Sequence, residues 1–172
     1  TTLESLSGLR TLFDDGVVTA GNASGINDGA AALIVGNREV GERCGVKPRA
    51  RIVAGAVAGV EPRGMGFGPV FAIRKALRRA DLQLSDMDII EINEAFASQV
   101  LGCLKLLDVD FSDSRVNPNG GAIAVGHPLG ASGARIALTA MRQLERGGGR
   151  YAAISLCIGI GQGLAAILER VD

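Results

Sequence analysis

Residues 127–163 decide the fold, and they read HPLGASGARIALTAMRQLERGGGRYAAISLCIGIGQG. Pro128 suits the first position of a helix, and the pattern predicts an amphipathic helix that runs to about Arg146 and is closed by three glycines. The apolar run 151–157 then predicts a strand, and a tight glycine turn leads to a second apolar run, 164–171. A turn this short predicts that the two strands are antiparallel neighbours in one sheet.

The same alternation of helix and strand continues upstream of this stretch. The predicted elements are strands over 52–60, 88–92 and 115–117 and helices over 69–80 and 94–107. Helices that alternate with apolar strands predict the α/β class, with helices packed on a mainly parallel sheet. The pattern therefore predicts one layered domain downstream of about residue 51.

Residues 1–48 have a different character. They comprise a short helix, a small polar loop over 20–29 that carries several glycines, a short apolar strand candidate over 30–35 and a polar linker. We therefore predict a domain boundary at the end of the linker, which divides residues 1–48 from residues 49–172. The chain begins with Thr rather than Met, so we expect it to be part of a longer protein.

The composition argues against several classes of function. Eighteen Lys and Arg balance 18 Asp and Glu, and aromatic residues make up only 3%, so we expect no nucleic-acid partner. No apolar run reaches the roughly 18 residues of a membrane span, so we expect no membrane partner. The three cysteines form neither a disulfide framework nor a zinc pattern. We therefore predict no metal site and a reducing, cytoplasmic location.

His127 is the only histidine of the chain, and it lies on a glycine-dense turn before the predicted long helix. One interpretation is a capping or packed histidine. The other is a general base, because the neighbouring glycines let a ligand or another backbone segment approach closely. A helix N-terminus disfavours the imidazolium and keeps a neutral ring available.

Cys157 ends the predicted strand 151–157, where the glycine turn begins. The ordinary interpretation is an inert buried thiol. However, parallel sheets expose their sites at the carboxyl ends of strands, and the amides of Gly159 and Gly161 are able to donate to an oxyanion. A histidine and a cysteine that each lie beside exposed amides are the parts of an acyl-transfer centre.

Asn93 and Glu94 also have two interpretations each. Asn93 is either the N-cap of the helix that follows or an amide that orients a water or an oxyanion. Glu94 is either a first-turn carboxylate favoured by the helix dipole or a residue of the site. The two roles of Asn93 are compatible with one another.

Two glycine runs raise a competing hypothesis, a generic nucleotide-binding domain. Gly64-x-Gly-x-Gly68 precedes a helix, but its spacing is not the dinucleotide fingerprint, and Pro69 removes an amide donor that a phosphate needs. The second run, 159–163, is followed by a strand rather than a helix. This hypothesis predicts NAD binding, which a titration tests.

Four blocks resemble the thiolases, which are acyl-CoA C-acyltransferases. They are residues 18–29 (VTAGNASGINDG), 93–96 (NEAF), 119–133 (NGGAIAVGHPLGASG) and 157–163 (CIGIGQG), in the family's order and with family-like spacing. The resemblance covers essentially the whole chain and is to the C-terminal part of the family. It implies the thiolase-like fold, in which two similar halves of mixed sheet and helices stack in layers around shared central helices. This chain would then hold one half and the end of the other.

The resemblance also implies roles for residues of the site. His127 matches the histidine that activates a nucleophilic cysteine and helps to stabilise an enolate oxygen. Cys157 matches the second cysteine, which moves the α-proton of acetyl-CoA and protonates the leaving thiolate. Asn93 would hold a water of the first oxyanion hole, and the Gly159 amide would belong to the second. The resemblance further implies that three residues contact the pantetheine or acyl chain: Ser24, Met65 and Phe96.

The resemblance implies coenzyme A and acyl-CoA as substrates, no covalently bound cofactor, and a homodimer or homotetramer. Many thiolases have glycine where this chain has Ile160, and the form CIGIGQG resembles the β-ketoadipyl-CoA and degradative branch. None of the three cysteines lies in a context that matches the acylated nucleophile, which the family carries in its first half. We therefore expect this chain alone to be inactive and to need the N-terminal half. The alternative function is a non-catalytic CoA-binding or assembly module.

Overall fold

A four-stranded mixed sheet forms the centre of the molecule, which is described here over residues 1–171 from a computed structural model. Its strands are β1 (Ala50–Gly59), β2 (Ile89–Ile92), β3 (Tyr151–Ile158) and β4 (Gln162–Arg170), and their order across the sheet is β1-β4-β3-β2. β4 is antiparallel to both β1 and β3, whereas β2 is parallel to β3. The predicted α/β class and the predicted antiparallel β3–β4 pair are confirmed. The prediction of a mainly parallel sheet is wrong, because two of the three strand pairings are antiparallel.

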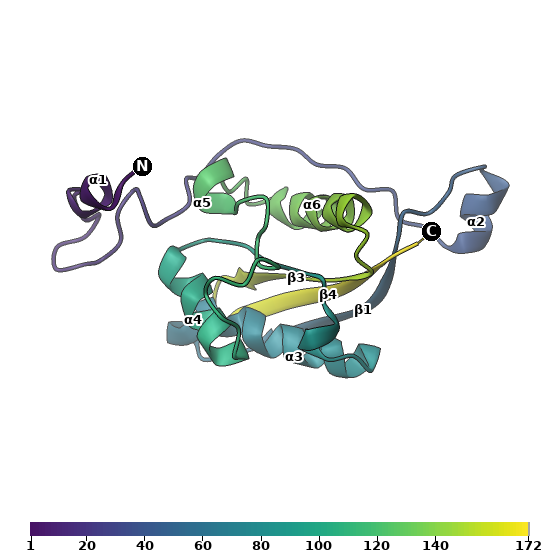
Figure 1. Ribbon diagram of the computed structural model, residues 1–172. Helices are drawn as coiled ribbons and strands as arrows, with labels where there is room; N and C mark the ends of the chain where they lie inside the picture. The colour runs from purple at the N-terminus through teal and green to yellow at the C-terminus, as the bar shows by residue number, and fades with distance from the viewer. Residues whose placement is uncertain (172) are drawn as a thin grey trace.

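Helices cover both faces of this sheet (Figure 1). The helix α6 (Ser132–Gly147) lies on one face, and α3 (Gly68–Ala80) and α4 (Ala97–Leu107) lie on the other. β2 shows why the layers form, because Ile89 packs with the α6 cluster and Ile90 with the α3 and α4 cluster. Alternate side chains of a strand point to opposite faces, so an uninterrupted apolar strand is buried on both sides.

Three short helical segments connect these elements. They are the 3-10 turns η1 (Pro62–Phe67) and η2 (Leu84–Asp86) and the single-turn helix α5 (Ala122–Val125). A close backbone contact holds the start of α3 against the start of β4, since a Cβ atom placed on Gly163 would lie 2.1 Å from the carbonyl carbon of Gly68. Only glycine fits at this contact.

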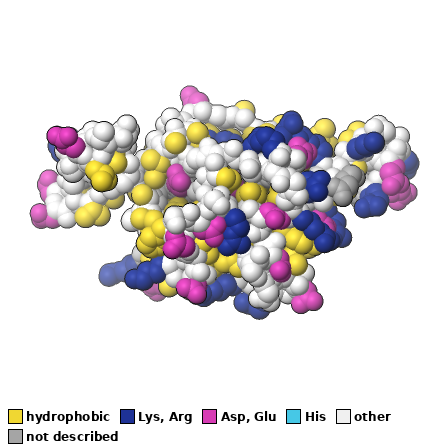
Figure 2. Space-filling model, in the orientation of Figure 1, with side chains coloured by type: hydrophobic (Ala, Val, Ile, Leu, Met, Phe, Trp, Pro, Cys, Tyr) yellow, Lys and Arg dark blue, Asp and Glu magenta, His cyan; other side chains and the backbone are white. Residues whose placement is uncertain are grey.

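The first 48 residues carry little regular structure. They contain α1 (Leu3–Ser7) and α2 (Arg38–Arg43), joined by a long extended segment that passes over α5 and α6 in Figure 1. The predicted strand over 30–35 is wrong, because no described strand pairs with this segment and its backbone stays irregular. Figure 2 shows the α1 end standing apart from the body, with exposed hydrophobic side chains that include Leu3, Leu12, Phe13 and Val17.

Three further expectations need correction. The helix predicted to begin at Pro128 begins at Ser132, because residues 128–131 form a turn in which the Pro128 carbonyl accepts from the Ser132 amide at 2.9 Å. The helix predicted to begin at Glu94 begins at Ala97, after a loop. The strand predicted over 115–117 is reduced to a single parallel bridge between Ile90 and Val116.

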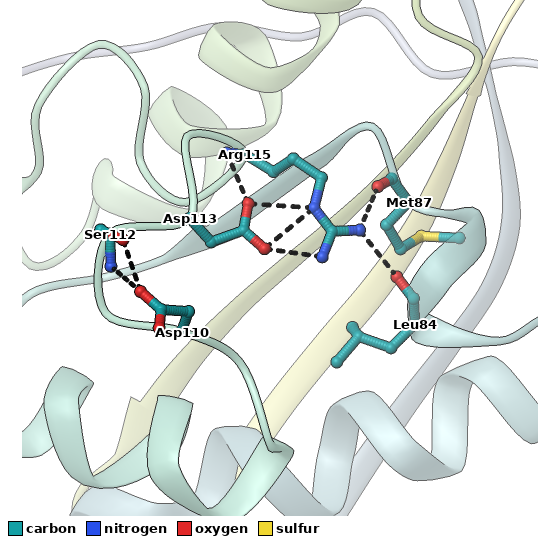
Figure 3. A network of polar contacts seen from close by, with 6 residues as sticks. All are labelled: Leu84, Met87, Asp110, Ser112, Asp113 and Arg115. Atoms are coloured by element: carbon teal, nitrogen blue, oxygen red, sulfur yellow. Dashed lines mark hydrogen bonds and ion pairs between the residues drawn. The ribbon is translucent and has the colours of Figure 1, made fainter.

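A polar network fixes the loop that follows α4 beside β2 (Figure 3). The Arg115 guanidinium pairs with Asp113 at 2.7 Å and also donates to the carbonyls of Met87 and Leu84. Asp110 caps the same loop by accepting from the Ser112 amide at 2.8 Å. These bonds hold the segment that leads to Asn117 against the edge strand of the sheet.

Within residues 1–171, no helix combines the length and the apolar character that a membrane crossing requires.

Candidate active site

Asn93 and His127 meet beyond the carboxyl end of β2. The Asn93 Nδ2 atom lies 3.3 Å from His127 Nε2, and the Asn93 amide donates to the Ser155 carbonyl of β3 at 3.0 Å. Because α4 begins four residues after Asn93, its side chain does not cap that helix, and the N-cap interpretation is wrong. The side chain is instead part of a buried polar contact with the only histidine.

Ser132 fixes the tautomer of His127. Its hydroxyl lies 2.6 Å from His127 Nδ1 and 3.1 Å from the Pro128 carbonyl oxygen. A carbonyl oxygen only accepts, so the single hydroxyl proton of Ser132 goes to Pro128, and Nδ1–H of the neutral ring donates to Ser132. Nε2 is then unprotonated and accepts from Asn93. The ring therefore presents a basic nitrogen whose orientation is set from both sides.

The environment of His127 keeps this ring neutral. Partial burial lowers the pKa of His127, and the positive charge of Arg135 lowers it further. Arg135 is held on the same turn, because its guanidinium donates to the Gly126 carbonyl at 2.7 Å. Near pH 7 the imidazole is thus neutral, as the general-base interpretation requires.

A strap from the N-terminal segment, residues 22–27, ties the two loops of the site together. The Ser24 amide donates to the Ala95 carbonyl at 3.0 Å, and the chain then runs on to His127, whose amide lies 3.0 Å from the Gly25 carbonyl and 3.1 Å from Asn27 Oδ1. Gly126 has a φ of +87°, and a Cβ there would lie 2.4 Å from Asn27 Oδ1. This turn therefore needs glycine both for its backbone conformation and for space.

Glu94 supports the second loop of the site. Its carboxylate accepts from the Asn117 side chain at 3.2 Å and from the Ile123 amide at 3.1 Å, while Asn117 also bonds to both backbone groups of Ile92 at 2.9 Å. A Cβ on Gly121 would lie 2.0 Å from the Glu94 carboxyl carbon. Glu94 thus braces the loop that leads to His127 and has no described contact with the imidazole.

Cys157 reaches the same edge of the sheet as Asn93. It is half-buried near the end of β3, two residues beyond Ser155, to which Asn93 is bonded. Burial raises the pKa of Cys157, although a backbone hydrogen bond acts in the opposite direction, so the group is a neutral thiol near pH 7. Its alternating neighbours Tyr151 and Ala153 pack with the α3 and α4 cluster, so Cys157 approaches this edge from the face opposite to α6.

The turn after Cys157 is exposed and carries free amides. Gly159 is exposed, and Ile160 adopts a φ of +70°. The Gly161 carbonyl accepts from the Val60 amide at 2.8 Å, which fixes the turn against β1. The Gly159 amide donates to no other group of residues 1–171, and so the turn offers a donor at the end of β3.

The residues predicted to contact the pantetheine or acyl chain lie on two segments. Ser24 belongs to the strap, and Phe96 is joined to the strap by an antiparallel bridge to Ala23. Met65 is half-buried in η1, whose start lies beside the β3–β4 turn. The end of the strap, the residues after it and the turn before α6 also line an open depression of about 320 Å³, formed by residues 27–31 and 128–131. Among residues 1–171, no three His, Cys, Asp or Glu side chains are grouped to hold a metal ion.

Two residues of the site were missed from the sequence. Ser132 has no exposed surface, and its signal is a serine five positions after a histidine at the first turn of a helix. Glu91 is 3% exposed in β2 and lines a second cavity, of about 240 Å³, behind Asn93. A charged residue within the apolar run IIEI was the available signal for Glu91, because such residues are seldom buried without a partner.

Comparison with known structures identifies the class to which this fold and site belong. The acetyl-CoA acetyltransferase of Bacillus anthracis superposes with a TM-score of 0.94 at 48% identity, over 99% of this chain and 43% of that one. Human mitochondrial 3-ketoacyl-CoA thiolase, in a crystal structure with CoA, gives a TM-score of 0.92 at 48% identity over the whole of this chain. The fold is therefore the layered α/β fold of the thiolases, as the resemblance implied.

The sequence comparisons lead to the family itself. The description "Thiolase, C-terminal domain" matches residues 46–170, and "Thiolase, N-terminal domain" matches residues 1–39. The chain is 61% identical over 172 residues to the 3-oxoadipyl-CoA/3-oxo-5,6-dehydrosuberyl-CoA thiolase of Escherichia coli K12 and 57% identical to a beta-ketoadipyl-CoA thiolase of Acinetobacter baylyi. The chain belongs to the thiolase family, and it spans 43% of the length of these relatives.

Proposed function

We propose that this chain supplies the acid–base and CoA-contacting part of an acyl-CoA C-acyltransferase. The enzyme would cleave a 3-ketoacyl-CoA with coenzyme A, or condense two acyl-CoAs in the reverse direction. One observation carries the proposal: Asn93 and Ser132 hold the His127 ring with Nε2 unprotonated, at the sheet edge that Cys157 also reaches. The names of the E. coli and A. baylyi relatives favour a 3-oxoadipyl-type substrate.

His127 would act first, as the base that takes the proton of a cysteine thiol in the N-terminal half. The resulting thiolate attacks the C3 carbonyl of the substrate, and the bond between C2 and C3 breaks. Cys157 then gives its proton to C2, which yields acetyl-CoA and leaves an acyl thioester on the nucleophile. The raised pKa of Cys157 supports this role, because the group must be protonated when the carbon needs a proton.

Two hydrogen-bond sites would stabilise the oxygens that gain charge. Asn93 is 3% exposed and its side chain lies beside Nε2 of His127, which supports a water held between Asn93 and the enolate oxygen. The exposed Gly159 amide would donate to the other oxyanion. Both donors lie at the carboxyl ends of neighbouring parallel strands.

The strap, with Ser24, would carry the pantetheine arm of coenzyme A past Phe96 and Met65. Support comes from the hydrogen bonds that join the strap to the loops of Asn93 and His127, because these bonds hold the strap beside the proposed base. No covalent cofactor enters this scheme.

We further propose that residues 1–48 close the N-terminal half, that residues 49–172 form the C-terminal domain, and that the remainder of the N-terminal half supplies the nucleophile. The chain alone would then be inactive, and the assembled enzyme would be a homodimer or homotetramer. Three free cysteines support a reducing compartment such as the cytoplasm. Incubation with acetyl-CoA followed by mass spectrometry tests the inactivity, since a stable acetyl thioester on any of these cysteines would contradict it.

A chimera tests the proposed function directly. Residues 1–172 replace the matching segment of the E. coli relative, and thiolysis of 3-oxoadipyl-CoA is followed. We expect activity in the chimera and a loss of roughly 100-fold or more in kcat for His127→Ala and for Cys157→Ala, because each removes a proton-transfer group. Cys44→Ser, at an exposed site, should leave the rate unchanged. Full activity in both site variants would refute the proposal.

The paired histidine and asparagine favour this enzyme over the non-catalytic module. A module that only binds CoA needs the strap, but it has no use for a histidine tautomer fixed by two buried partners. In the chimera, a module would retain CoA binding and show no turnover.

A further inference from the structure

Glu91 is a buried carboxyl group for which the proposed reaction has no role. It lies in β2 two residues before Asn93, and both side chains line the cavity of about 240 Å³ between β2 and α6. Both residues are 3% exposed. Because i and i+2 residues of a strand share a face, the two polar groups point to the same side of the sheet, on which Ile89 packs with α6.

Each of the two side chains has one buried oxygen atom without a hydrogen-bond partner in the described part of the chain. Glu91 Oε1 and Asn93 Oδ1 are both buried and have no hydrogen-bond partner within residues 1–171. Two acceptors cannot satisfy one another, and a buried polar atom without a partner destabilises the fold. A proton on the Glu91 carboxyl removes the conflict, because a carboxylic acid has one O–H donor.

The charges around Glu91 favour this protonated form. Burial raises the pKa of Glu91 to about 7, and the negative charge of Glu94 raises it as well, whereas Arg135 acts in the opposite direction. Arg135 forms no ion pair with Glu91 within residues 1–171, and its guanidinium donates to the Gly126 carbonyl instead. Glu94 comes from the loop after β2 and Arg135 from α6, so these are the charged groups that face Glu91 from the neighbouring elements.

We propose that Glu91 is a positioning residue of the site: its neutral carboxyl donates to Asn93 Oδ1, directly or through one water in the cavity, and so keeps Asn93 Nδ2 directed at His127 Nε2. A chain of hydrogen bonds would then start at Glu91 and pass through Asn93 to His127. From the imidazole it continues through Ser132 to the Pro128 carbonyl, and each bond has one donor and one acceptor. The inference rests on the proposed function only in assuming that Asn93 and His127 belong to the reacting site.

The chain offers a direct readout, because His127 is its only histidine and gives a single imidazole Hε1 signal in NMR. The Asn93 side-chain amide signals are followed together with it from pH 5 to 9. In the wild type we expect the Asn93 signals to change with a midpoint near 7, as Glu91 loses its proton. The midpoint of His127 itself lies lower, so the two events are separable.

Two substitutions decide the matter. Glu91→Gln keeps a donor at every pH, so the midpoint near 7 should vanish from the Asn93 signals, and only the change that accompanies the titration of His127 should remain. Glu91→Met removes the donor, so above the His127 midpoint the Asn93 signals should resemble those of the high-pH wild type. An Asn93 midpoint near 7 that persists in Glu91→Gln, or wild-type Asn93 signals in Glu91→Met, would overturn the inference.

Kinetics of the chimera separates this inference from the proposed function. With wild-type Glu91 we expect kcat to fall above pH 7 at unchanged KM, and Glu91→Gln should remove that fall, which a purely structural role would not do. An inactive chimera with the expected NMR behaviour would refute the proposed function and leave the role of Glu91 standing. An active chimera whose pH profile is the same with Glu91→Gln would refute the role of Glu91 alone.

Discussion

Asn93 Nδ2 and His127 Nε2 lie 3.3 Å apart, although the two residues are separated by 34 positions in the chain. Three segments make this contact possible. β3 holds Asn93 through the Ser155 carbonyl, the strap holds the His127 amide, and α6 contributes Ser132 behind the ring. The contact therefore depends on the fold as a whole, and each support gives a separate test.

Ser132→Ala should change the tautomer of His127. Loss of the hydroxyl removes the acceptor for Nδ1–H, so the proton is no longer fixed on Nδ1 and moves in part to Nε2. Long-range ¹H–¹⁵N spectra of the imidazole report the tautomer directly. The matched control is Ser155→Ala, since Ser155 is equally buried but donates to the Leu164 carbonyl. An unchanged ¹⁵N pattern in Ser132→Ala would show that the tautomer has another origin.

Arg135→Met should raise the pKa of His127, because the variant removes one of the two causes that lower it. Burial remains, so we expect the midpoint to rise but to stay below the ordinary value of 6.5. The Hε1 titration measures it. Arg135→Lys keeps the charge and should shift the midpoint less, while Arg142→Met, at a more exposed site of α6, should shift it hardly at all.

Because folding lowers the pKa of His127, the free energy of unfolding also depends on pH. A histidine whose pKa is lowered by folding binds its proton more weakly in the native state than in the unfolded chain. Glu91, whose pKa is raised, contributes in the opposite direction over the same pH range, so the test is made with Glu91→Gln as the parent protein. There the free energy of unfolding should fall as the pH drops below about 6.5 and through the lower native pKa of His127, and Arg135→Met should weaken the fall. Urea denaturation at pH 5 and pH 7 measures the difference. An equal dependence in both proteins would contradict the role of Arg135.

Part of the fold and of the site could be predicted from the residue pattern. The rest could not, and the physical reasons can be named. The β3–β4 pair follows from an apolar run and a glycine turn, whereas the catalytic assignment of His127 and Cys157 rests on the family blocks and stays a prediction. Ser132 was missed because Pro128 suits the first position of a helix, and a helix that began there would not contain the turn that brings Ser132 back to the imidazole. Helix propensity alone does not indicate that turn, which the Pro128 carbonyl closes.

The N-terminal strand was predicted wrongly for a related reason. Residues 30–35 are apolar enough for a strand, but a strand also needs a neighbour to share its hydrogen bonds, and no described segment provides one. Ile34 is 97% exposed there. Propensity describes a residue's preference, whereas pairing is decided by which segments come together.

The three cysteines should react with iodoacetamide at very different rates. Cys44 is exposed and should react first, and Cys157, half-buried with a raised pKa, should follow. Cys103 should be last, because its sulfur is buried against the Gly66 carbonyl and its pKa is raised to about 11 from 9.0. That rise alone lowers the thiolate fraction about 100-fold at pH 8. Peptide mass spectrometry over time measures the order, and early labelling of Cys103 would contradict the packing of α4.

Gly163→Ala should destabilise the protein strongly. The added methyl group would lie 2.1 Å from the Gly68 carbonyl carbon, and because both partners are backbone, β4 and the start of α3 must separate. We expect a loss of about 3 kcal/mol in the free energy of unfolding by urea. Gly133→Ala in α6 is the control, because a methyl group there meets nothing within 4 Å and should add stability of up to about 1 kcal/mol. Equal effects at the two positions would contradict the close backbone contact.

Ile160→Gly should stabilise the turn that follows Cys157. Ile160 has a φ of +70°, which is costly for a β-branched residue, and its side chain is 89% exposed, so little apolar burial is lost with it. Glycine removes the strain but gives the unfolded chain more freedom, so we expect a net gain of about 0.5–1 kcal/mol in the free energy of unfolding. Ile158→Gly, in the regular part of β3, should lose a similar amount. A loss in both variants would mean that the left-handed conformation is carried at no cost, and the turn would then owe its shape to the bonds that hold Gly161 against β1.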